Sequence, residues 1–195
     1  MKRRSLLAGL ALVPLVLGLA PRRAWAIGGL LPELEQPAPD FELDGVAPGG
    51  NLLTSKAGSE ALPIHIGLNQ LAGRWLVLYF YPKDFTSGCT LEARGFQQDL
   101  AAFQAESASV IGVSADDLEA HASFCGSEGL VFPLLSDPGG VVSRRYGSWI
   151  APYSQRHTFL IDPRGILRQR WTAVRPSGHS QEVLAELQRQ KSSIA

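Results

Sequence analysis

The stretch that most constrains this chain is residues 75–92, which places a cysteine where a strand passes into a helix. The run from Trp75 to Tyr81 is rich in aromatic and branched residues and predicts a buried strand, which Pro82 ends. The hydroxyl-bearing residues that follow are typical of the start of a helix. Apolar side chains then recur at helical spacing, at Phe96, Leu100 and Phe103. We therefore expect Cys89 in the first turn of a helix, where partial positive charge favours the nucleophilic thiolate.

Length and composition limit the possible architectures. A chain of 195 residues with 45% hydrophobic residues indicates one domain with a substantial core and makes disorder improbable. Two cysteines, Cys89 and Cys125, are too few for a disulfide scaffold. They do not form a CxxC pair, which argues against a thioredoxin or a zinc knuckle. The four histidines are scattered, so no metal site and no cofactor are predicted.

The formal net charge of zero conceals an uneven distribution along the chain. Residues 1–26 hold five basic side chains and no acidic one, which leaves the remaining residues with 13 basic and 18 acidic side chains. An acidic domain is poorly suited to a phosphate backbone, so nucleic acid is not an expected partner.

Residues 1–26 have the pattern of a cleavable export signal. A basic start, Lys2-Arg3-Arg4, precedes the apolar run from Leu6 to Ala20 and an A-x-A site at residues 24–26, which predicts a mature chain beginning at Ile27. An uncleaved anchor is the alternative, although the run is shorter than the roughly 20 residues of a spanning helix. The arginine pair fits either a twin-arginine or a Sec signal. We expect export to the periplasm, or to the thylakoid lumen in a photosynthetic source, without lasting membrane association.

The rest of the chain, residues 27–195, alternates strand and helix patterns. Residues 38–43 resemble the start of a strand, and residues 44–70 carry turn signals that predict a surface insertion or a small hairpin. The later expected elements are strands at 109–114, 132–135, 157–161 and 166–172, and helices at 116–128, 141–146 and 181–190. Asp162-Pro163-Arg164-Gly165 predicts a tight turn between the last two strands. This order indicates one α/β domain in three layers with a mixed sheet.

The motif Pro82-x-x-x-Thr86-x-x-Cys89 after a strand resembles that of the peroxiredoxins, which are thiol peroxidases. The surrounding YFYPKDFTSGCTLE, with APDF, LLSDP and TFLID elsewhere, is similar to the peroxiredoxin Q (bacterioferritin comigratory protein) branch. The resemblance runs from about Gln36 to the last helix. It implies a thioredoxin-like fold, a central mixed sheet flanked by helices, and the reduction of hydrogen peroxide and organic hydroperoxides.

The resemblance also implies roles for individual residues, each of which has a plainer alternative. Cys89 would be the peroxidatic nucleophile, or else a buried inert cysteine. Thr86 would offer its hydroxyl to the thiolate or the peroxide, or cap the helix. Pro82 would shield the thiolate, or only end the strand. Arg156, two residues before a Thr-Phe pair, would donate to sulfur and peroxide, or be a solvated turn residue. Glu92 would orient the arginine, or simply face the helix dipole.

The second cysteine fits one of the two subtypes of this branch. Many members carry a cysteine five residues after the first, where this chain has Arg94, whereas others place it in the next helix, where Cys125 lies. The resemblance thus implies that Cys125 resolves the oxidised Cys89 by an intramolecular disulfide, that thioredoxin or a similar dithiol reductant recycles it, and that the protein is a monomer. Because Cys125 shares helical spacing with Leu118 and Ala122, it could instead be a packing residue in a one-cysteine enzyme.

Two other classes of function remain open at this stage. A non-peroxidase thiol oxidoreductase or redox chaperone would use both cysteines without needing Thr86 or Arg156. A binding module on the same fold would use Cys89 for packing alone. Consumption of peroxide by the mature protein distinguishes the peroxidase from both.

Overall fold

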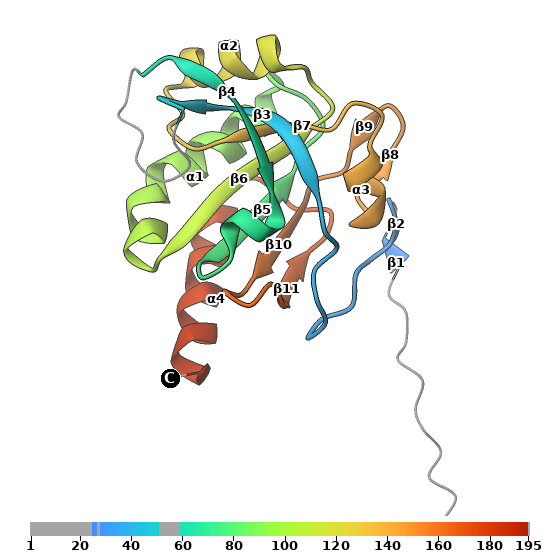
Figure 1. Ribbon diagram of the computed structural model, residues 1–195, viewed down its shortest axis with the longest axis vertical. Coiled ribbons are helices and arrows are strands. Elements are labelled where there is room, and N and C mark those ends of the chain that lie inside the picture. The colour runs from blue at the N-terminus through green and yellow to red at the C-terminus, as the bar shows by residue number, and fades with distance from the viewer. Residues whose placement is uncertain (1–24, 27, 51–58, 195) are drawn as a thin grey trace, which may run out of the picture.

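The computed structural model describes residues 25–26, 28–50 and 59–194, which form a three-layer α/β fold around a seven-stranded sheet (Figure 1). The strand order is β11-β10-β5-β6-β7-β3-β4. The strands are β3 (Glu42–Pro48), β4 (Ala61–Gly67), β5 (Trp75–Phe80), β6 (Ala108–Ser114), β7 (Leu134–Ser136), β10 (His157–Ile161) and β11 (Leu167–Trp171). Strands β5, β6 and β7 are parallel, and the remaining pairs are antiparallel. The expected mixed sheet is therefore confirmed.

Helices cover both faces of this sheet and create two hydrophobic cores. The helical elements are η1 (Leu68–Leu71), α1 (Ser87–Ala105), α2 (Leu118–Glu128), α3 (Val141–Arg145) and α4 (His179–Ile194). One core lies under α1, α2 and α4 and includes Tyr79, whereas the other lies under α3 and η1 and includes Phe80. Every residue of β5 is buried, because a central strand between two helical layers presents both of its faces to a core.

The predicted insertion at residues 44–70 belongs to the sheet itself. Strands β3 and β4 form an antiparallel hairpin, and β3 also pairs with β7, so the hairpin is one edge of the central sheet (Figure 1). A Cβ at Gly45 would lie 2.4 Å from the Leu134 carbonyl oxygen, so a glycine is needed where β3 meets β7. The expected hairpin is present as β3 and β4, and residues 51–58 of the predicted surface insertion lie outside the described residues. Pro63 and the exposed edge position of β4 obscured its strand pattern.

Other short elements lack a sequence signal. Two-residue strands β8 (Trp149–Ile150) and β9 (Tyr153–Ser154) pair across a cis Ala151–Pro152 bond, and strands this short show no periodicity. By contrast, the predicted turn before β11 is confirmed, with the Gly165 amide donating to the Asp162 carbonyl over 2.9 Å.

The N-terminal part of the chain is described only from residue 25. Strand β1 (Trp25–Ala26) pairs with β2 (Gly29–Leu30), and the predicted export signal otherwise lies outside the described residues. In the described part of the chain, no helix has the length and apolar character needed to cross a bilayer.

Candidate active site

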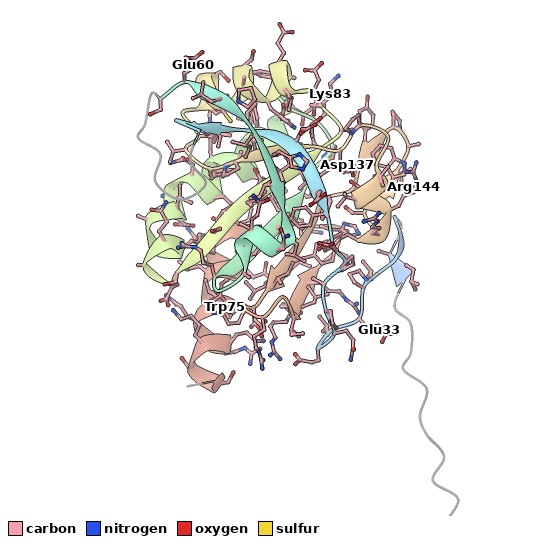
Figure 2. The ribbon with its side chains drawn as sticks, in the orientation of Figure 1. Glu33, Glu60, Trp75, Lys83, Asp137 and Arg144 are labelled. Atoms are coloured by element: carbon pink, nitrogen blue, oxygen red, sulfur yellow. The ribbon has the colours of Figure 1, made fainter. Side chains whose placement is uncertain are left out.

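Cys89 lies in the first turn of α1, just beyond the carboxyl end of β5. Figure 2 labels Trp75 at the start of β5 and Lys83 just after its end, and the two lie at opposite ends of the sheet. Phe85 has a φ of 61°, and Thr86 is extended with φ −77° and ψ 144°, so the chain turns sharply before the helix begins. This turn places Cys89 at the helix N-terminus with only 1% of its surface exposed. The predicted strand–helix junction is therefore confirmed.

Arg156 reaches the sulfur from the neighbouring strand. Its Nη2 atom donates to Cys89 Sγ over 3.4 Å, and its Nη1 atom donates to a Glu92 carboxylate oxygen. Strand β10 begins with His157 opposite Phe80, the last residue of β5, so the antiparallel register delivers Arg156 to the end of β5 where α1 starts. The structure thus brings together the predicted cysteine, arginine and glutamate, and the reading of Arg156 as a solvated turn residue is wrong.

Glu92 holds the arginine from inside the protein. Its side chain is 1% exposed, one turn below Cys89. Burial raises the pKa of Glu92 to about 7, although the ion pair and hydrogen bond with Arg156 oppose that shift. Its second oxygen, Oε1, has no hydrogen-bond partner among the described residues. Burial of an incompletely paired carboxylate is costly, which is why the pKa of Glu92 is raised despite its contact with Arg156.

Gly88 is a site residue that sequence analysis missed. A Cβ at this position would lie 3.0 Å from Arg156 Nη2, tighter than ordinary van der Waals contact. The absence of a side chain therefore gives the guanidinium room beside the helix N-terminus. The sequence shows a glycine directly before the cysteine, but the need for a glycine there follows only from the position of Arg156 in the folded protein.

Thr86 and Pro82 lie in the segment that joins β5 to the Cys89 helix. The Thr86 hydroxyl donates to the Lys83 carbonyl over 3.0 Å and makes no capping hydrogen bond to the helix, so the helix-cap reading of this side chain is wrong. Its oxygen lone pairs remain available to accept a hydrogen bond. Pro82 is half-buried and lines a cavity of about 450 Å³ together with Arg156. The remaining lining residues are Ala26, Gln155, His157, Thr172, Ala173 and Val174.

Cys125 lies on the inner face of α2, in the same hydrophobic core as Cys89. Both thiols are free and buried in this structure. Burial, followed by the negative charge of Asp84, raises the pKa of Cys125 to about 12. At neutral pH the Cys125 thiol is consequently protonated and unreactive as long as α2 stays folded. The structure shows it both as a packing residue and as the only other thiol among the described residues.

Two buried polar residues next to the site were also missed. Asp84 and His121 lie within hydrogen-bond distance of each other, with side chains 1% and 0% exposed, between the loop that precedes α1 and helix α2. Asp84 is part of the motif stretch, but nothing local in the sequence assigns it a partner. His121 is one of the four histidines whose spacing predicted no site.

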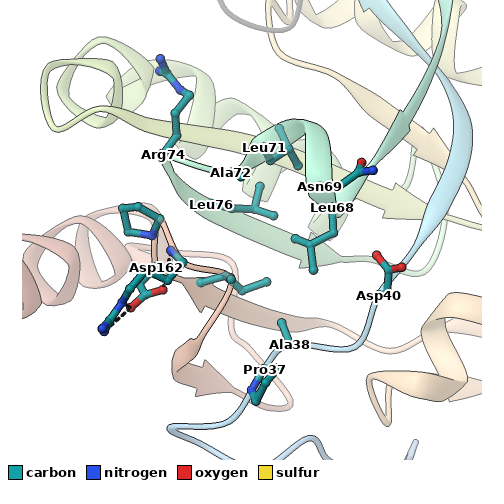
Figure 3. Close-up of a pocket in the computed structure, with 14 residues that line it drawn as sticks. Pro37, Ala38, Asp40, Leu68, Asn69, Leu71, Ala72, Arg74, Leu76 and Asp162 are labelled. Carbon is teal, nitrogen blue, oxygen red and sulfur yellow. Dashed lines mark hydrogen bonds and ion pairs between the residues drawn. The ribbon is translucent and has the colours of Figure 1, made fainter.

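A further cavity lies away from the sulfur. It has a volume of about 360 Å³ and is lined by residues around the start of β5, including Arg74, Leu76 and Asp162 (Figure 3). Because Cys89 follows the other end of β5, this cavity does not belong to the candidate site. In the described residues, no group of three or more His, Cys, Asp and Glu side chains is arranged to hold a metal ion.

Comparisons with known proteins connect this geometry to a family. The AhpC/TSA family profile matches residues 34–170. Peroxiredoxin Bcp of Xanthomonas campestris is 37% identical over 163 residues, covering 79% of this chain and 93% of that protein. Peroxiredoxin Bcp of Bacillus subtilis is 34% identical over 163 residues, covering 80% and 94%. The solved structure of Xanthomonas campestris peroxiredoxin Q is 33% identical with a TM-score of 0.63 and covers 74% of this chain and 89% of its own, which confirms the expected thioredoxin-like fold.

Proposed function

This chain belongs to the AhpC/TSA family, in the branch of the Bcp and peroxiredoxin Q proteins, and from that premise we propose that Cys89 is its peroxidatic nucleophile. The protein is a thiol peroxidase, as the sequence predicted. The observation that carries the assignment of Cys89 is the 3.4 Å contact from Arg156 Nη2 to its sulfur in the first turn of α1. The contact places the guanidinium where it can donate to the sulfur and to a bound peroxide.

The geometry supports a direct displacement at the peroxide. The Cys89 thiolate attacks the terminal oxygen of the hydroperoxide, the O–O bond breaks, and the leaving oxygen takes a proton to become an alcohol or water. Cys89 is left as a sulfenic acid. Arg156 stabilises the negative charge that spreads over both oxygens in the transition state. Thr86 is placed to accept a hydrogen bond from the peroxide O–H, because its own proton is used on the Lys83 carbonyl.

We propose that Cys125 then resolves the sulfenic acid. The Cys125 thiol attacks Cys89 Sγ, the S–S bond forms as the S–O bond breaks, and water leaves. A dithiol reductant such as thioredoxin reduces the disulfide. Structures of the Xanthomonas campestris peroxiredoxin Q include two cysteine-to-serine mutants, and the mutated cysteines are as many residues apart as Cys89 and Cys125. Because this cycle needs only one chain, we further propose that the protein is a monomer.

The test is a peroxidase assay with hydrogen peroxide and an organic hydroperoxide, coupled to thioredoxin and its reductase. Cys89→Ser should abolish turnover. Cys125→Ser should retain the first oxidation of Cys89 but lose turnover with thioredoxin, and Cys89 should become over-oxidised. Peptide mapping of the peroxide-treated protein should link Cys89 to Cys125. If Cys125→Ser turned over at the rate of the unmodified protein, the enzyme would be of the one-cysteine type.

We also propose that the protein is exported, on the basis of the basic and apolar segments and the A-x-A site within residues 1–26. Intact mass of the protein isolated from its source should correspond to a chain beginning at Ile27. A protein that retains Met1 in the cytoplasm would contradict the proposal.

A further inference from the structure

A buried polar cluster links the loop before α1 to the helix that carries Cys125. Asp84 Oδ1 accepts a hydrogen bond from the Tyr81 hydroxyl over 2.7 Å, and Asp84 Oδ2 lies 2.8 Å from His121 Nδ1. His121 Nε2 lies 3.2 Å from the carbonyl oxygen of Leu135 in β7. The Asp84 and His121 side chains are 1% and 0% exposed. No step of the peroxidase reaction described above uses this cluster.

The partners of His121 show how firmly the ring is held. Both ring nitrogens of His121 face oxygen atoms, Nδ1 that of Asp84 and Nε2 that of the Leu135 carbonyl, and the Tyr81 hydroxyl lies 3.4 Å from Nδ1. The ring is therefore fixed from two sides in a place without exposure to water. Breaking one of these buried contacts leaves a polar group unpaired, which is unfavourable.

Two more contacts join the same pair of segments. The Asp84 amide donates to Asp116 Oδ2, just before α2, over 3.0 Å. Phe85, in the left-handed backbone conformation, packs the edge of its ring against Phe124 at a centroid distance of 5.2 Å. The buried residues of α2 are His121, Phe124 and Cys125, so the two residues that contact the loop lie on the buried face of the helix together with Cys125. The contacts therefore fasten the Cys89 loop to the turn of α2 that holds Cys125.

Resolution must join two thiols that are both buried in the reduced fold. A disulfide needs Cα atoms within about 7 Å and a suitable approach of the Cβ atoms. In the reduced fold, Cys125 is buried, and burial together with Asp84 raises the pKa of its thiol to about 12. Opening of α2 would expose the thiol to water and move it away from Asp84, so that its thiolate becomes accessible near neutral pH. Local opening of this kind must first break the Asp84–His121 pair.

We propose that Asp84 and His121 form a latch that keeps the Cys89 loop and the Cys125 helix closed for peroxide attack, and that release of this latch limits the rate at which Cys125 attacks oxidised Cys89. Both are positioning residues, because they act through the two segments and touch neither sulfur. The inference rests on the proposed role of Cys125 as the resolving cysteine. The latch leaves the chemistry of disulfide formation unchanged: one S–S bond forms, one S–O bond breaks and water is released.

The test separates the two chemical steps. Reduced protein is mixed with one equivalent of hydrogen peroxide and no reductant, then quenched with acid and a thiol-alkylating reagent at increasing times. Mass spectrometry follows loss of the Cys89 thiol and appearance of the Cys89–Cys125 peptide. Asp84→Asn and His121→Phe should each accelerate the second step about tenfold, which is near the upper end of the effect of losing one ordinary intramolecular hydrogen bond. Loss of a residue that only supports the fold would loosen the protein in general, which the control variants below report.

A matched control comes from a His–Asp contact on the β3–β4 hairpin. His65 Nδ1 and Asp44 Oδ1 are also 2.8 Å apart, but their side chains are 61% and 71% exposed on the β3–β4 hairpin. His65→Phe and Asp44→Asn should leave the rate of disulfide formation unchanged. Equal acceleration by the control variants would overturn the latch, because it would reflect general loosening of the protein.

A second measurement does not depend on the variants folding. Hydrogen exchange of the unmodified reduced protein should show peptides covering 82–90 and 118–128 opening together, at a lower free energy than peptides from β5. Exchange of α2 only through global unfolding would overturn the proposal. If the unmodified protein formed no Cys89–Cys125 disulfide, the role of Cys125 and the latch would both fail. If that disulfide formed but the folded variants made it no faster, the latch alone would fail.

Discussion

Replacing Arg156 by methionine should slow the attack of Cys89 on peroxide without removing the nucleophile. The change deletes the donor that lies 3.4 Å from Cys89 Sγ and preserves most of the side-chain volume. A hydrogen bond to a charged group contributes about 1.5–3 kcal/mol in a protein. If all of that contribution is present in the transition state, the second-order rate constant should fall about 10- to 150-fold.

The same replacement has a second effect that must be separated from the first. It leaves Glu92 buried, with 1% of its side chain exposed and no ion-pair partner. Removing one member of a buried ion pair costs about 3–5 kcal/mol of folding stability. The double variant Arg156→Met/Glu92→Gln removes both charges, so it should recover much of the lost stability while the rate stays low. Stability that recovers without activity would show that the arginine acts on the reaction.

The assay measures loss of the Cys89 thiol after reduced protein meets hydrogen peroxide at pH 7, with no reductant present, so that recycling has no influence. Urea unfolding of the same samples reports stability. Arg94→Met is the matched control, because Arg94 also lies on α1 but its ion pair with Glu128 leaves the arginine side chain 64% exposed. An exposed pair contributes about 0–1 kcal/mol, and its loss should leave the rate within about twofold. A folded double variant that kept the unmodified rate would refute the reasoning.

Three further predictions follow from the site. Burial, opposed by Arg156, raises the pKa of Glu92 from 4.5 to about 7 in the folded state. The stability that protonated Glu92 contributes is therefore complete below pH 4.5 and is lost as the pH rises through 7. Urea titrations should show a smaller loss of folding stability between about pH 5 and 8 in Glu92→Gln than in the unmodified protein. Gly88→Ala adds a Cβ 3.0 Å from Arg156 Nη2 and should slow peroxide attack by displacing the guanidinium, as rapid-quench assays would reveal. Thr86→Val removes the acceptor for the peroxide and should slow attack about 5- to 30-fold, whereas Thr86→Ser should preserve the rate; equal rates in the two variants would contradict that role.

The local part of the site was predictable because it depends on neighbours in sequence. Continuous apolar character defined β5, helical spacing defined α1, and the motif between them placed Cys89 at the helix N-terminus. Arg156 could be chosen only through the resemblance to a family, because nothing local distinguishes it from other arginines before a strand. The structure supplied the reason, which is that the register of β10 against β5 carries Arg156 to the sulfur.

The parts that sequence analysis missed all depend on contacts between distant segments. The β3–β4 hairpin is recognisable as part of the sheet only through its pairing with β7. The lack of a side chain at Gly88 matters only because Arg156 lies beside it in the folded protein. The hydrogen bond from the Thr86 hydroxyl to the Lys83 carbonyl likewise follows from the backbone turn before α1. The high pKa of Cys125 likewise comes from burial and from Asp84, which are properties of the packed structure.

The sequence by itself determined the α/β class, the strand–helix junction at Cys89 and the presence of one further thiol at Cys125, because periodicity, turn residues and motif spacing act over a few residues. Only the tertiary structure decided that Asp84 faces His121 across 37 positions of the chain. A polar side chain gains such a partner only when strands pair in one register and helices pack on them. The buried contact that joins the two cysteine-bearing segments therefore depends on the tertiary packing of distant segments, which no local sequence pattern specifies.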